Sequence, residues 1–287
     1  MKVATLKNLA ANIMSTNSLV EVVELLKDFC ENKADGRDWL RYSYKLLSFL
    51  EGPNNGQKTP FEIITLKGNS KLPFASFSTI AIYSCPGRGP CETWCYSVKS
   101  WRYPAAFFRQ LQNSIFMRYL PDLITKAFEE IPSSVSKLRL YVDGDFSSVS
   151  DVIFWFDLIA NRPSIKVYGY SKSWDEIHKA SQLVSVPSNY ILNISGGGKV
   201  RETSKETMLG LPMVRGEFIA VPLSKVKDKS NKRFALPEYH SETRASGYET
   251  TGRKVFSCPG LCGTCSNGDH ACGSDRFKGI PIAIGIH

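Results

Sequence analysis

The stretch "LRLYVDGDFSSVSDVIFWFDLIANRPSIKVYGYSKSWDEIHKASQLV", residues 138–184, decides the fold. It contains two β-rich runs, 138–144 and 165–171, and each is followed by a segment with hydrophobic residues at helical spacing. Parallel strands need a crossover connection, which is usually a helix. The order of strand, polar loop and helix therefore predicts two βα units of a parallel sheet.

The same order continues on both sides of this stretch. Upstream, "TIAIYS" (79–84) precedes a helix expected over 104–130; downstream, "YILNISGGG" (190–198) precedes a helix over 199–210, and "FIAVPLS" (218–224) follows. No G-x-G-x-x-G motif follows the first strand, which disfavours a dinucleotide-type doubly wound sheet. We predict an α/β protein built on a complete or partial (β/α) barrel, with an open doubly wound sheet as the alternative.

Three regions are expected along the chain. Residues 1–60 predict a small N-terminal helical unit, because 17–36 and 37–52 both carry hydrophobic residues at helical spacing. Residues 61–253 would form the barrel. Residues 254–287 would form a Cys/His metal-binding segment packed on it.

Composition narrows the function classes. The chain has 287 residues, of which 43% are hydrophobic, so it can bury a full core. Lysine and arginine number 36 against 27 acidic residues, and the net charge of +9 favours an anionic partner such as nucleic acid. The excess is spread along the sequence, so an ordinary basic globular protein fits the charge equally well. Hydrophobic runs are too short to span a membrane and no secretory signal is visible, which predicts a cytoplasmic protein.

The tail "SCPGLCGTCSNGDHACG" (257–273) is expected to bind metal. In a reducing compartment, clustered cysteines are more often metal ligands than disulfides. Tetrahedral zinc takes four ligands, and a C-x-x-C pair is a typical part of such sites. The tail and the C-terminus offer Cys258, Cys262, Cys265, His270, Cys272 and His287.

A second cluster follows the first expected strand. Cys85, Cys91 and Cys95 form a C-x5-C-x3-C trio, and "SCPG" opens both this segment and the tail. Three thiolates could hold an iron–sulfur cluster with one open iron, or join a fourth ligand from elsewhere. In one hypothesis the trio pairs with Cys258, while Cys262, Cys265, Cys272 and His287 form a second site. Metal would then tie the first strand to the last and close the barrel.

Polar residues stand where the expected strands end. Asp143 and Asp145 are two apart, and so lie on one side of an extended segment, as catalytic carboxylates or as a turn that caps the next helix. "SGGGK" (195–199) lacks the Walker spacing, but its glycines would let a backbone approach a ligand. The residues expected at the next two strand ends are Tyr168, Tyr170, Lys172, Ser195, Gly196, Gly197 and Lys199.

Four motifs in order resemble the phage gene product 88 family. They are the N-S-K segment at 69–71, the cysteine trio with its following tyrosine, the G-D-F at 144–146 with the Y-S-K-S strand end, and a cysteine tail that closes with histidine. The layout is also similar to the tRNA-guanine transglycosylase superfamily, whose phage members insert 7-deazaguanines into DNA. Those enzymes are (β/α) barrels with catalytic aspartates at strand ends and a structural zinc site after the barrel.

This similarity implies a DNA-guanine transglycosylase. Asp143 and Asp145 would be the catalytic pair, with one attacking the sugar C1′ to form a covalent glycosyl-enzyme that a free 7-deazaguanine base then resolves. A flipped guanine needs aromatic walls and phosphate anchors. These would come from Phe146, Tyr168, Tyr170, Lys172, Lys199 and Arg88.

Two alternatives stay open. In the first, the cysteine trio holds a [4Fe–4S] cluster in a radical-type barrel enzyme that acts on nucleic acid. In the second, the chain is a zinc-bearing DNA-binding protein without catalytic activity.

Overall fold

The computed structural model describes residues 1–52, 57–69, 71–199, 201–228, 230–263, 265 and 270–286. Within this part, seven strands form one sheet in the order β1-β2-β3-β4-β5-β7-β6, and every pair of neighbours is parallel. The strands are β1 (Ala75–Ser76), β2 (Lys137–Leu140), β3 (Lys166–Ser171), β4 (Tyr190–Ser195), β5 (Val214–Pro222), β6 (Phe256–Ser257) and β7 (Ile282–Ile286). The predicted parallel α/β class is confirmed.

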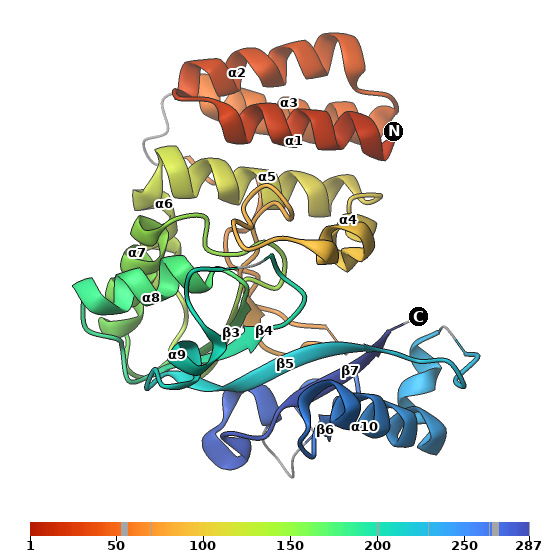
Figure 1. Cartoon of the computed structure of the whole chain (residues 1–287). Coiled ribbons are helices and arrows are strands. Elements are labelled where there is room, and N and C mark those ends of the chain that lie inside the picture. Colours follow the sequence, from red (N-terminus) through yellow and green to blue (C-terminus); the bar gives the residue numbers. More distant parts are fainter. Residues whose placement is uncertain are drawn as a thin grey trace.

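The sheet is a curled half-barrel (Figure 1). Strands β1 and β6 stand at the two ends of the strand order, and Ser76 of β1 also forms an antiparallel bridge with Thr65. The partial form of the expected barrel is therefore the one found, and closure of the first strand onto the last is not.

One expected strand is wrong. Residues 81–84 of "TIAIYS" form a turn, and β1 lies just upstream at 75–76. The Ile80 amide donates to the Ser114 hydroxyl on a helix, at 2.8 Å, instead of to a neighbouring strand. Ile82 adopts φ +67°, a conformation that ends an extended run and that β-branched residues rarely take.

Ten α-helices accompany the sheet in the described part. They are α1 (Val3–Ser15), α2 (Leu19–Asp28), α3 (Arg37–Glu51), α4 (Tyr96–Ser100), α5 (Pro104–Tyr119), α6 (Pro121–Glu129), α7 (Val149–Ala160), α8 (Trp174–Leu183), α9 (Lys205–Leu209) and α10 (Pro237–Thr251). The helix expected over 104–130 is two helices, because Leu120 leaves helical geometry (φ −139°) and Pro121 begins the next one.

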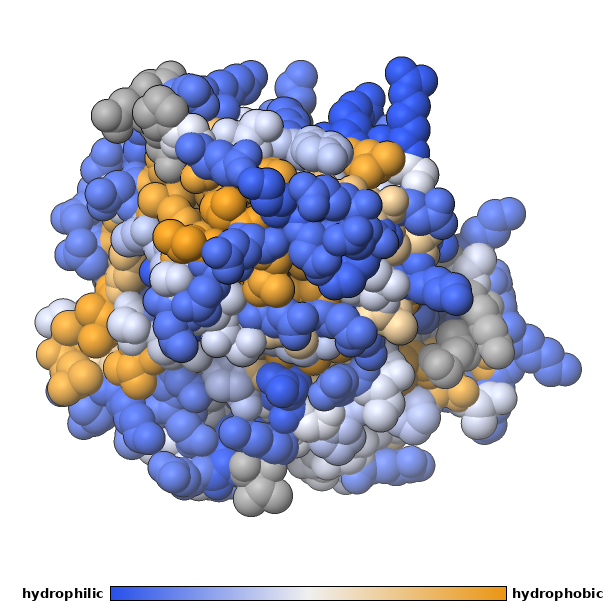
Figure 2. Space-filling model, turned by 90° about the horizontal axis from the view of Figure 1, so that it is seen from above, coloured by the Kyte–Doolittle hydropathy of each residue, from blue (hydrophilic) through white to orange (hydrophobic). Residues whose placement is uncertain are grey.

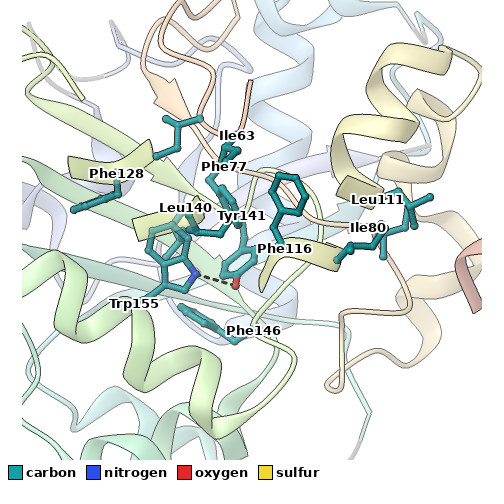
Figure 3. Close-up of a cluster of buried hydrophobic side chains, with 14 of the residues drawn as sticks. Ile63, Phe77, Ile80, Leu111, Phe116, Phe128, Leu140, Tyr141, Phe146 and Trp155 are labelled. Atoms are coloured by element: carbon teal, nitrogen blue, oxygen red, sulfur yellow. Dashed lines mark hydrogen bonds between the residues drawn. The ribbon is translucent and has the colours of Figure 1, made fainter. Parts of the chain in front are cut away.

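Alternation along the strands gives the sheet two different faces. The outer face carries Leu138, Leu140 and Val167 and belongs to the main hydrophobic core. Figure 3 shows part of this core, where the Trp155 indole donates to the Tyr141 hydroxyl at 3.1 Å. The inner face carries Arg139 and Tyr168, and Tyr168 belongs to a separate cluster built with residues of the C-terminal tail.

The N-terminal helices pack on α5. Trp39 of α3 contacts the rings of Phe107 and Phe108, and the Thr16 hydroxyl lies 2.8 Å from that of Tyr119. Seen from above, their outer surface is largely hydrophilic with smaller hydrophobic areas (Figure 2). These contacts join helices of the expected unit 1–60 to the same core as the sheet.

The C-terminal region contains elements that the sequence analysis did not place. Helix α10 lies against β5, β6 and β7, and the Tyr239 hydroxyl accepts from the Gly285 amide at 3.0 Å. Strand β7 inserts between β5 and β6, so the strand order departs from the chain order at this end of the sheet. No helix in the described part is long and hydrophobic enough to cross a membrane.

Candidate functional site

Two cysteine-bearing segments define the candidate site. The cysteine loop is residues 85–95, which contain Cys85, Cys91 and Cys95, and the cysteine tail is residues 258–272. The loop follows the turn at 81–84, where the Ile82 carbonyl accepts from the Cys85 amide at 3.2 Å and from the Arg88 side chain at 3.0 Å. These bonds hold Ile82 at positive φ, and retained backbone strain of this kind clusters at functional sites.

The cysteine loop lies directly on the carboxyl ends of β3 and β4. A Cβ on Gly87 would stand 1.8 Å from the Lys172 carbonyl oxygen, and a Cβ on Gly89 would stand 2.5 Å from the Lys199 amide. The Cys91 amide donates to the Gly197 carbonyl at 3.3 Å. Both glycines are therefore required for a close backbone approach, and the glycine-rich end of β4 supports the loop.

Cations accompany the thiols of the loop. Burial raises the pKa of Cys85 far above its usual range; Asp145 and Cys95 add to this, while Lys172 opposes it. The Lys172 ammonium donates to the Ser195 hydroxyl at 2.8 Å. Burial lowers the pKa of Arg201, and the charge of Cys91 opposes that change. Two positive side chains thus lie within electrostatic reach of these cysteines, a setting that favours thiolates once a metal binds.

Asp145 is held by three donors. Its carboxylate accepts from the Ser171 hydroxyl at 2.6 Å, the Lys172 amide at 2.7 Å and the Phe146 amide at 2.9 Å. The residue is 5% exposed, and burial raises its pKa while these bonds oppose the shift. Asp145 therefore fastens the end of β2 to the end of β3, which leaves little of the carboxylate available for a substrate.

Asp143 is held more loosely. One carboxylate oxygen accepts from Gln110 at 3.1 Å and from the Ser78 hydroxyl at 3.3 Å. Burial raises its pKa, and the Ser97 hydroxyl and the Arg139 charge oppose the rise. Nearby Tyr96 is 58% exposed, and its hydroxyl donates to the Val142 carbonyl at 2.8 Å.

The residues expected to bind substrate divide into two groups. Phe146 and Tyr168 are 1% and 0% exposed, so neither ring is open to a flipped base; Phe146 packs on Tyr141, with 4.8 Å between ring centroids. Tyr170 is half-buried and packs on Phe218 at 4.7 Å. The accessible or half-buried group at the strand ends consists of Arg88, Lys172, Ser195, Gly196, Gly197 and Lys199.

The cysteine tail packs on the inner face of the sheet. Asn193 on β4 donates to the Cys272 carbonyl at 2.8 Å, and His270 lies between the rings of Phe74 and Tyr168. The Cys262 amide donates to the Lys71 carbonyl at 3.0 Å, just before β1. The tail thus crosses the inside of the half-barrel from β6 to the segment that precedes β1.

The four tail cysteines influence one another. Burial raises the pKa of Cys258 to about 11 and that of Cys272 to about 12. The charge of Cys262 adds to both shifts, and Cys265 adds to that of Cys258. Cys258 therefore lies within electrostatic reach of the other tail cysteines.

Soft donors in this number suit zinc, because cysteine thiolates form most structural zinc sites. No group of three His, Cys, Asp or Glu side chains in the described part is already arranged around one ion. His287, the remaining expected ligand, lies outside the described residues.

Arg139, Arg201 and Tyr96 were not identified from the sequence. Arg139 lies on the inner face of β2, stacked 4.7 Å over the Tyr170 ring, and Arg201 stacks 3.8 Å over Trp174. The alternation in "LRLYVDGDF" carries a signal for Arg139, since a charge between two buried leucines faces the opposite side of the sheet. Arg201 has no comparable signal, because only the tertiary fold brings it to the loop.

Comparison with known families gives one finding. The family described as gene product 88 matches residues 48–273, which is most of the chain. The chain belongs to the gene product 88 family. The resemblance to this phage family is therefore confirmed, and the matched region includes both the cysteine loop and the cysteine tail up to Gly273. No curated protein and no solved structure matched the chain.

Proposed function

We propose that this member of the gene product 88 family is an iron–sulfur enzyme of the radical type that acts on nucleic acid. Cys85, Cys91 and Cys95 would hold a [4Fe–4S] cluster and leave one iron open for a ligand. The observation that supports this most is the position of the cysteine loop on the carboxyl ends of β3 and β4. Parallel α/β folds bind their ligands at this edge.

Three cysteines match the donor type that such a cluster takes. The three ligands of a cluster bind different irons, so they surround a larger space than the ligands of a single ion. Lys172 acts on Cys85 and Arg201 on Cys91, which would offset part of the negative charge of the thiolates. When bound, the cluster would supply one-electron chemistry to a ligand at the open iron.

The residues around the loop have distinct roles in this proposal. Asp145 and Ser195 fix Lys172, so that its ammonium stays beside Cys85. Exposed Lys199 and Arg88 would contact the phosphate backbone of the substrate from the rim of the site. Asp143, whose pKa burial raises, would exchange a proton with a bound substrate.

The test is anaerobic reconstitution with iron and sulfide. We expect about four iron atoms per chain and a brown chromophore, both lost in a Cys85→Ser/Cys91→Ser/Cys95→Ser variant that still folds. Cys30→Ala is the matched control, because Cys30 is 3% exposed within the main core. Folded wild-type protein that takes up no iron would refute the proposal.

Base exchange in DNA by a DNA-guanine transglycosylase is the second candidate function. It is favoured by Asp143, whose hydrogen bonds from Gln110 and Ser78, at 3.1 and 3.3 Å, are longer than the bonds that hold Asp145. This activity would insert 7-deazaguanine into DNA, survive in the triple cysteine variant and disappear in Asp143→Asn. Nucleoside analysis of DNA from cells that express each variant and receive the base would separate the two functions.

We also propose a structural zinc ion held by Cys258, Cys262, Cys265 and Cys272. The mutual influence of these thiols and their position on the inner face support it. Elemental analysis should find about one zinc per chain, retained by the loop variant and lost when Cys262 and Cys265 are replaced by serine. A zinc-free protein of unchanged stability would contradict this assignment.

A further inference from the structure

Two buried polar atoms on the inner face lack a hydrogen-bond partner among the described residues. They are Nε of Arg139 and the hydroxyl of Tyr168. The two residues are directly paired in the register of β2 and β3, and Tyr168 is 0% exposed. Buried polar groups are nearly always bonded, so two neighbouring orphan donors indicate an acceptor that completes them.

Arg139 also has no ionic partner in the described part of the chain, where no carboxylate oxygen lies within 4.0 Å of its guanidinium. Asp143 is close enough to act on it electrostatically, but the bonds to Ser78 and Gln110 direct that carboxylate elsewhere. The guanidinium stacks on the face of Tyr170, with 4.7 Å from its central carbon to the ring centroid. A semi-buried arginine without an anion is costly unless a ligand supplies one.

The surroundings connect Arg139 with the cysteine loop. The Arg139 side chain is half-buried. Burial acts to lower its pKa, but the charges of nearby side chains outweigh burial and raise it; these are Tyr170, Tyr96, Tyr168 and Cys262. Tyr96 directly follows Cys95, the last cysteine of the loop, and is 58% exposed. The Arg139 guanidinium therefore lies within electrostatic reach of the residue that directly follows the cysteine loop.

We propose that Arg139 and Tyr168 form an oxyanion subsite that binds a phosphate or carboxylate group of the substrate. The planar guanidinium offers paired N–H donors that match either group, and the tyrosine hydroxyl adds a third donor. In assigning the anion to the substrate, this inference rests on the proposed function. The binding itself requires no iron.

The test is calorimetric titration of the purified, iron-free chain with three probes: inorganic phosphate, a dinucleoside monophosphate and acetate. Arg139→Gln should weaken binding of the preferred probe by about tenfold or more, and Tyr168→Phe by a few fold, because bonds to charged groups are the stronger ones. The preferred probe separates a phosphate source from a carboxylate source. Thermal unfolding of each variant verifies that it folds.

The matched control is Arg102→Gln. Arg102 stacks 4.8 Å over the Tyr103 ring on the exposed surface, so this variant makes the same change of charge at an equivalent ring contact. It should bind the probes like wild type. Three results would overturn the subsite. Both arginine variants could lose probe affinity equally, Arg139→Gln could bind the probes like wild type, or Arg139→Gln could change the zinc content alone. Iron uptake by wild type tests the proposed function separately.

Discussion

The cysteine loop and the cysteine tail begin with the same tetrapeptide but are held in different ways. Backbone contacts at Gly87, Gly89 and Cys91 fix the loop on the strand ends, beside two cations. Side chains of the inner face hold the tail, among them Asn193. The cysteine loop lies at the carboxyl ends of the strands, where we propose chemistry, whereas the cysteine tail lies on the inner face, where we propose a structural metal ion.

Serine substitutions should show the largest difference between the two segments. Replacing Cys258 or Cys272 should abolish zinc binding and cost several kcal/mol of folding free energy, because a structural zinc ion contributes roughly 10 kcal/mol or more to folding. Replacing Cys85 or Cys91 should leave the melting temperature within a few degrees. Circular dichroism and metal content of all four variants test this, and equal destabilisation by both pairs would remove the distinction.

Arg215 provides a metal-free test of the tail. The residue is 1% exposed, and its guanidinium donates to the Asn193 side chain and to the carbonyls of Phe277 and Ile280, each at 2.8 Å. Arg215→Met leaves these acceptors buried without donors, at a cost of about 3 kcal/mol or more. Urea unfolding measures it.

Arg253→Met is the surface control for this substitution, because Arg253 is exposed. It should change the unfolding midpoint little. An Arg215→Met midpoint equal to that of the control would mean that the Arg215 bonds contribute little to the stability of the C-terminal region.

Gly87→Ala tests the position of the loop. The added Cβ would overlap the Lys172 carbonyl, so the loop must move away from β3. We expect loss of iron incorporation with a stability cost of about 1–2 kcal/mol, smaller than that of the tail variants. Anaerobic iron analysis beside thermal unfolding checks both parts. Full iron content in this variant would mean that close packing on β3 is unnecessary for the site.

Strands β2, β3 and β4 and the helices after them could be predicted from the sequence, because a hydrophobic strand followed by a helical pattern is a local signal. Residues 79–84 show the limit. Their β-rich composition matches a strand, but the Ser114 hydroxyl bonds the Ile80 amide and the chain turns at Ile82. Tertiary contacts from α5 override the local preference there.

The candidate site was predictable in its residue types but only partly in its geometry. The cysteines and the aspartates at strand ends can be identified from the sequence, whereas the difference in burial between Asp145 and Asp143 cannot. Phe146 illustrates the point, since its position after Asp145 suggested the site but its ring packs on Tyr141 in the core. Arg139 and Tyr168 became neighbours only through the register of β2 and β3.

The smallest expected effect concerns Asp143, at the strand ends. Because burial raises its pKa in the folded state, the wild-type protein loses stability as pH rises from the unfolded-state pKa, about 3.9, through the raised folded-state value. Asp143→Asn has no such ionisation, so its stability relative to wild type should increase with pH across this window and level off above it. Chemical denaturation from acid to neutral pH measures the difference. A stability difference that stays constant with pH would mean that Asp143 is charged in the folded protein at no cost. Asp143 would then lie in a polar, solvated part of the site, which would strengthen its candidacy as a nucleophile.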